Sequence, residues 1–137
     1  MVFVSRKEHF NAAHKLYNLK WSKEKNEEVF GKCANDYFHG HNFELIVTVK
    51  GEPDPDTGFV IDMKKLGDLV KEEIIEKVDH KNLNMQVDFL KDKLCSCEII
   101  VQEFWIILEP RIKKMSSGQL HCIKLIETNK NYVEYYG

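Results

Sequence analysis

The sequence predicts an α+β fold in which a four-stranded antiparallel sheet is covered by two helices on one face. Apolar residues alternate with polar ones in four segments and recur at helical spacing in two others. Along the chain the order is strand, strand, helix, helix, strand, strand, and strands grouped apart from helices are typical of the α+β class. The other face of the sheet must then be solvated or covered by another subunit.

The first two predicted strands are separated by a long segment. The first covers residues 2–13, and the second begins at His39 and continues through residues 45–49, where apolar and polar side chains alternate. The intervening residues 15–38 are too many for a hairpin turn, and connections of this length in compact domains are usually functional. Within them, residues 22–30, closed by Gly31, predict a short helix.

Two helices and two further strands complete the expected fold. Residues 63–77 have apolar side chains at helical spacing, with Asp62 as N-cap, and Ser96 is placed to cap a second helix over residues 97–114. Residues 120–127 and 132–136 read as the last two strands, joined by a hairpin turn.

Composition limits the class of protein. The 137 residues predict a single domain spanning 1–137, with 43% hydrophobic and 31% charged residues and a net charge of −2. This composition predicts no nucleic-acid partner, and no apolar stretch is long enough to predict a membrane partner. The four cysteines, without a secretory pattern at the N-terminus, predict reduced thiols and a cytoplasmic protein.

Three histidines are placed to meet at one point. His39 and His41 open the second strand, and strand residues two apart project from the same face. His14 ends the first strand, beside His39 if the two strands pair antiparallel. A set of three histidines is typical of a zinc ion with an open fourth position. Taken singly, a His-x-His pair is more often exposed, and His14 more often a hydrogen-bonded core residue.

Cys33 and Glu127 are candidates for chemistry. Cys33 lies six residues before His39, and a nearby cation would favour its thiolate as a base or nucleophile, the alternative being a small buried hydrophobe. Glu127 shares the parity of apolar strand residues, so its carboxylate must be paired or bind a ligand unless the sheet edge is solvated. Such a carboxylate could bind a ligand whose ring has an amidine-like edge, by accepting two hydrogen bonds from it.

Two other groups have weaker signals. Asp79 and His80 follow the first long helix, where they form either an acid–base pair or a helix terminus with a favourably placed histidine. The segment Cys95-Ser96-Cys97 lacks the spacing of a metal site, and a packing role is expected for it.

Five motifs occur along the chain: Phe10-Asn-Ala-Ala-His14, Phe30-Gly-Lys-Cys33, His39-Gly-His41-Asn, Asp79-His80-Lys-Asn-Leu and Glu127-Thr. Each motif alone is weak, but five in order are highly specific. Together they resemble the 6-pyruvoyltetrahydropterin synthase family, in the same order and with similar spacing from about Phe3 to Gly137.

This resemblance implies a tunnelling fold, in which four-stranded sheets assemble into a β-barrel as trimers and then hexamers. It implies one Zn²⁺ on His14, His39 and His41, and Cys33 as the catalytic proton acceptor. It further implies that Glu127 anchors a pterin ring, next to substrate-binding residues 96 and 97. The residues matching Asp79 and His80 form a charge-relay pair that reaches the site from a neighbouring subunit.

The implied reaction converts 7,8-dihydroneopterin triphosphate to 6-pyruvoyltetrahydropterin with release of triphosphate, a carbon–oxygen lyase step of tetrahydrobiopterin biosynthesis. A sister branch in queuosine biosynthesis, 6-carboxytetrahydropterin synthase, takes the same substrate and also releases acetaldehyde. The long segment before Cys33 and the five residues between Cys33 and His39 favour the pyruvoyl branch. Against it, Ser96-Cys97 and residues 36–38 depart from the animal enzymes where substrate binds. A third branch, with glutamate in place of Cys33, is disfavoured. A non-catalytic pterin- or zinc-binding protein is the alternative from another class.

Overall fold

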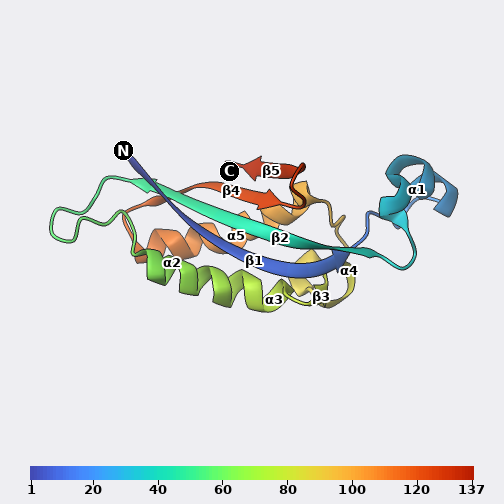
Figure 1. The fold of residues 1–137 in the computed structure, drawn as a ribbon, viewed down its shortest axis with the longest axis horizontal. Helices are drawn as coiled ribbons and strands as arrows, with labels where there is room; N and C mark the ends of the chain where they lie inside the picture. Colours follow the sequence, from blue (N-terminus) through green and yellow to red (C-terminus); the bar gives the residue numbers. More distant parts are fainter.

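A twisted sheet forms the backbone of the fold, as seen in a computed structural model that describes residues 1–137. Its strand order is β3-β1-β2-β4-β5. The long strands β1 (Val2–His14) and β2 (His39–Gly51) pair antiparallel along their whole length, and β4 (Gln119–Ile126) pairs antiparallel with β2. The strand β5 (Tyr132–Tyr135) closes one edge of the sheet (Figure 1).

The prediction of a four-stranded, wholly antiparallel sheet is wrong, because the sheet has five strands and one of them is parallel to its neighbour. A fifth strand, β3 (Lys81–Asn82), pairs in parallel with Ala12 and Ala13 of β1, so the sheet is mixed. Two residues are too few to produce an alternating pattern in the sequence. The strand exists because the preceding turn is hydrogen-bonded to Asn11 of β1.

The helices agree with the predicted segments, with one interruption. The segment predicted as one helix is α2 (Met63–Val70), a π-helical turn over Lys71–Ile75 and α3 (Glu76–Val78). Asp62 caps α2 as predicted, accepting hydrogen bonds from two backbone N–H groups. A π turn takes in an extra residue, which apolar periodicity does not reveal. The long helix α5 (Cys97–Met115) is capped by Ser96.

One apolar core joins the sheet to these helices. Strand side chains of one parity, including Val47 and Val49, are buried in one cluster with Leu66 of α2 and Phe104 of α5. The short helix α4 (Leu83–Gln86) and a 3₁₀ turn over Asp88–Leu90 connect the two helical regions. No helix combines the length and the apolar character needed to cross a membrane.

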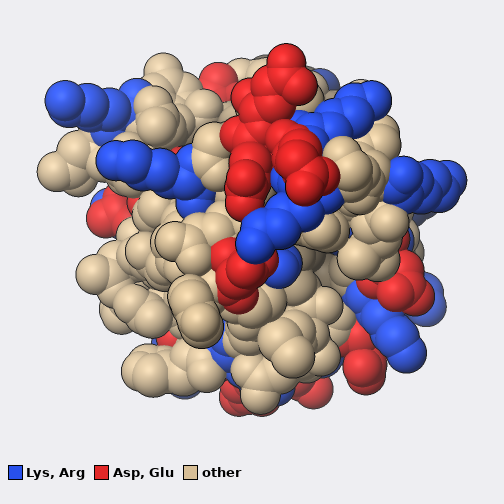
Figure 2. Space-filling model, turned by 90° about the vertical axis from the view of Figure 1, so that its right-hand side faces the viewer, with Lys and Arg blue, Asp and Glu red and all other residues tan.

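The long segment between β1 and β2 builds one end of the molecule. It contains α1 (Lys23–Phe30), capped by Ser22, and a 3₁₀ turn over Gly31–Ala34. Figure 2 looks onto this end, where acidic side chains gather between lysines, and the sequence of α1 mixes both signs. Lys23 pairs with Asp36 across the segment at 3.2 Å. The charge here is therefore mixed rather than uniformly basic.

Candidate metal centre and adjoining cavity

The pairing of β1 with β2 brings three histidines together. Their register places His14 opposite His39 and Ala12 opposite His41, as predicted from the antiparallel arrangement. His14 is only 2% exposed, and the ring centroids of His39 and His41 lie 4.6 and 5.3 Å from its own. The three imidazoles therefore form one compact group at the end of the two long strands.

Hydrogen bonding determines which nitrogen of His14 faces this group. Its Nδ1 lies 2.7 Å from the carbonyl oxygen of Cys95. A carbonyl only accepts, so Nδ1 carries the hydrogen, and in the neutral ring Nε2 has a free lone pair. This arrangement, in which a backbone carbonyl orients the ring, is typical of metal-binding histidines.

Burial favours the neutral form of His14 and His39. Burial is the main reason that the pKa of His14 is lowered, and burial followed by the charge of His41 lowers the pKa of His39. His14 Nε2, His39 Nδ1 and His41 Nε2 are all buried without a hydrogen-bond partner. Buried polar atoms are rarely left without partners, so three together call for a ligand that accepts lone pairs.

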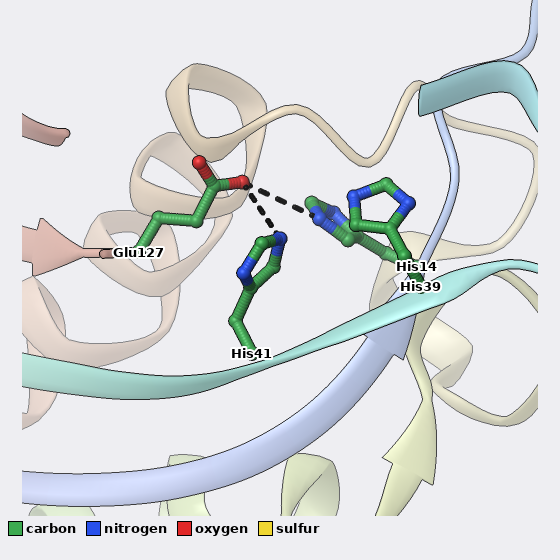
Figure 3. A group of neighbouring side chains, drawn as sticks. All are labelled: His14, His39, His41 and Glu127. Carbon is green, nitrogen blue, oxygen red and sulfur yellow. Dashed lines mark ion pairs between the residues drawn. The ribbon is translucent and has the colours of Figure 1, made fainter. Parts of the chain in front are cut away.

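Glu127 completes a group of four potential ligands. Its Oε1 lies 3.4 Å from His14 Nε2 and 3.3 Å from His41 Nε2, as the dashed lines in Figure 3 mark. One ligand atom from each of the four residues lies within 4.8 Å of the others. Three nitrogens and one carboxylate oxygen, directed at a common point, form a donor set that fits Zn²⁺.

A cavity of about 400 Å³ adjoins this group. Cys33 lines it from the 3₁₀ turn after α1, and this turn is held by a hydrogen bond from Leu16 N to Cys33 O at 2.8 Å. Ser96 and Cys97 line it from the start of α5. Burial, reinforced by the charge of Glu127, raises the pKa of the Cys97 thiol to about 12, so this thiol is protonated at physiological pH.

The cavity has walls that the sequence did not indicate. Lys130 lines it from the turn between β4 and β5 and Tyr132 from the start of β5, while Leu16 and Glu98 contribute from elsewhere. Closeness to Glu127 along the chain was the one available signal for the turn residues. Their position depends on the antiparallel pairing of β5 with β4.

The predicted acid–base pair lies outside this cavity. Asp79 Oδ2 lies 2.9 Å from His80 Nδ1, but His80 is 82% exposed and neither residue lines the cavity. Asn11 of β1 donates its N–H to Asp79 and accepts the N–H of His80, and the hydrogen bond from Asn11 is the main reason that the pKa of Asp79 is lowered. Packing of Cys95 is confirmed, since its side chain is buried in the core.

Residues 3–137 match the family model described as 6-pyruvoyl tetrahydropterin synthase. The chain belongs to this family. A human 6-pyruvoyl tetrahydrobiopterin synthase is 40% identical over 134 residues, covering 98% of this chain and 90% of the relative. The protein of the same name from Dictyostelium discoideum is 37% identical over 136 residues, covering 99% and 96%.

A solved structure of this synthase family has the same fold. The Caenorhabditis elegans 6-pyruvoyl tetrahydropterin synthase superposes with a TM-score of 0.87 at 35% identity, covering 99% of this chain and 95% of that one. The resemblance inferred from the five sequence motifs is therefore confirmed at the level of the family and of the α+β fold.

Proposed function

We propose that this protein converts 7,8-dihydroneopterin triphosphate to 6-pyruvoyltetrahydropterin, releasing triphosphate as a zinc-dependent carbon–oxygen lyase. Membership of the family and the names of the relatives support the conclusion that this protein is an enzyme, and that it is a pterin synthase. One observation carries the finer proposal: three unpartnered imidazole nitrogens meet Glu127 beside a cavity that Cys33 also lines.

His14, His39 and His41 would hold the zinc ion. The hydrogen bond to the Cys95 carbonyl orients His14 for this, and burial keeps the ring neutral. Bound there, Zn²⁺ supplies Lewis acidity to oxygens of the substrate side chain.

The cavity residues would bind and deprotonate the substrate. The carboxylate of Glu127 accepts two hydrogen bonds from the amino group and a ring N–H of the pterin, which fixes the ring within the cavity. Ser96 and Cys97 flank it, and the protonated Cys97 thiol serves as a weak donor. Cys33 removes a carbon-bound proton from the side chain as the bond to the triphosphate oxygen breaks, and tautomerisation completes the 6-pyruvoyl product.

Asp79 and His80 would act in the cavity of a neighbouring subunit of a trimer or hexamer. Asp79 orients the imidazole through Nδ1, and the exposed position of His80 leaves the ring available to another chain. There, His80 supplies or accepts protons during elimination and tautomerisation.

Mass spectrometry of the products from zinc-loaded protein and 7,8-dihydroneopterin triphosphate tests the proposal, with metal-stripped protein as the control. We expect a 6-pyruvoyl product and no acetaldehyde. A 6-carboxy product with acetaldehyde would instead assign the protein to the queuosine branch. Untouched substrate would favour a protein that binds pterin or zinc without catalysis.

A further inference from the structure

The distances from Glu127 to two of the histidines, His14 and His41, have the dimensions of a metal-ligand set. In a tetrahedral zinc site with bonds of about 2.0–2.1 Å, neighbouring ligand atoms are about 3.3–3.4 Å apart, because a tetrahedron's edge is about 1.6 times its centre-to-corner distance. Glu127 Oε1 lies 3.4 Å from His14 Nε2 and 3.3 Å from His41 Nε2 (Figure 3). Both separations equal that edge.

Hydrogen bonding does not explain these contacts. A charge-assisted N–H···O⁻ bond is about 2.7–2.9 Å long, shorter than either separation. Neither His14 Nε2 nor His41 Nε2 has a hydrogen-bond partner, although the carboxylate is their neighbour. In His14 the hydrogen is on Nδ1, so the neutral ring directs a lone pair at a carboxylate oxygen. Two acceptors that face each other need a proton or a metal cation between them, and these separations are too long for a shared proton.

We propose that Glu127 is the fourth ligand of the resting zinc site, and that the substrate ring must displace it. Anchoring the ring occupies both carboxylate oxygens, so Oε1 cannot serve the metal and the ring together. The Glu127 side chain is 22% exposed and lines the cavity, so an entering ring can reach it. The displacement rests on the proposed function, because it requires a pterin ring, whereas ligation by Glu127 does not.

Zinc affinity, measured by competition with a chromophoric chelator, tests the ligation. Loss of outer-shell partners costs about 10–100-fold in metal affinity, so loss of a direct ligand in Glu127→Gln should weaken zinc binding at least about tenfold. Glu127→Asp, which keeps the charge but retracts the carboxylate, should lose affinity to a similar degree. Glu98→Gln is the matched control, since Glu98 lines the same cavity outside the ligand group.

Two results of this measurement would overturn the ligation. One is unchanged zinc affinity in Glu127→Gln. The other is wild-type affinity in Glu127→Asp alongside a loss in Glu127→Gln, because the charge alone would then account for the effect. Since the aspartate variant retains the negative charge, the test does not depend on folding of the amide variant.

Binding of unsubstituted pterin tests the displacement. Linkage requires that if pterin and zinc compete for Glu127, each weakens the binding of the other by the same factor. We therefore expect pterin to bind the metal-stripped protein more tightly than the zinc-loaded protein. Equal or tighter binding to the zinc-loaded protein, or no binding to either form, would overturn the displacement. Absence of both pterin binding and turnover would also refute the proposed function, while the chelator result would still decide the ligation.

Discussion

Two backbone carbonyl oxygens accept hydrogen bonds from candidate functional histidines. The carbonyl of Cys95 accepts the Nδ1 hydrogen of His14, which directs Nε2 at the ligand group. The carbonyl of Asn11 accepts the N–H of His80, which stands in a left-handed conformation with φ of 58°. Side-chain motifs identify the two histidines, but backbone atoms remote in sequence determine their orientation.

At Cys33 we predict a loss of catalysis without a loss of metal. Replacing a general base typically lowers the rate by about 10²–10⁴-fold, which is the expected fall in kcat for Cys33→Ala. Bound zinc should stay at the wild-type level, because Cys33 is not one of the four clustered ligands. Turnover and metal content are measured together, with Cys122→Ala as the control at a buried cysteine outside the cavity. Full activity in Cys33→Ala would show that another group takes the proton.

At the scale of elements, an ion pair joins the two helical regions. Glu73, in the π-helical turn after α2, is only 8% exposed, and its carboxylate contacts Lys77 Nζ at 2.9 Å and Arg111 Nη1 of α5 at 3.2 Å. The hydrogen bond from Lys77 is the main reason that the pKa of Glu73 is lowered. The lowered pKa means that this carboxylate stays ionised in the folded protein at a pH where it would be protonated in the unfolded chain.

This pair predicts a pH-dependent contribution to stability. A depressed pKa in the folded state stabilises the protein above the unfolded value of about 4.3, and the contribution is lost as the pH falls through the folded pKa. Glu73→Gln should therefore be less stable than wild type at pH 7, with the difference shrinking below about pH 4. Urea unfolding at pH 7 and below about pH 4 measures the free energy of unfolding of both proteins, with the exposed Glu76→Gln as the control. A difference independent of pH would attribute the effect to packing.

At the scale of the whole molecule, the candidate catalytic groups are divided between two places. Cys33 and Glu127 line one cavity, while Asp79 and His80 lie at the sheet edge beside β3. A second copy of the chain could bring the two places together, as the family resemblance implies. The face of β1 turned away from the helices is exposed in the single chain, as the sequence predicted.

Mixed oligomers test this division. Cys33→Ala and His80→Ala should each be inactive alone, and co-expression should restore up to about a quarter of wild-type activity, because random assembly leaves that share of sites intact. Cys33→Ala co-expressed with Glu127→Gln is the control, since both residues line the same cavity of one chain and each chain then lacks one of them. If His80 acted within its own chain, the first mixture would recover nothing.

Local patterns were sufficient for most of the fold. Alternation predicted β1, β2, β4 and β5, and the caps Asp62 and Ser96 marked the starts of α2 and α5. The strand β3 was missed because two residues have no period, and the π turn because it depends on packing. Both exceptions are short, and both are held by contacts with distant parts of the chain.

The sequence by itself determined the family of this protein and a candidate site: three histidines, a cysteine and a glutamate, at spacings that predict one metal and one ring-binding carboxylate. Only the tertiary structure decided that Cys95 orients His14, that residues 130–133 line the cavity, and that Glu127 lies at ligand distance from two imidazoles. Spacing along a strand fixes the face from which a side chain projects, because the backbone repeats every two residues. It carries no information about atoms brought together from separate elements, which depend on how the whole chain packs.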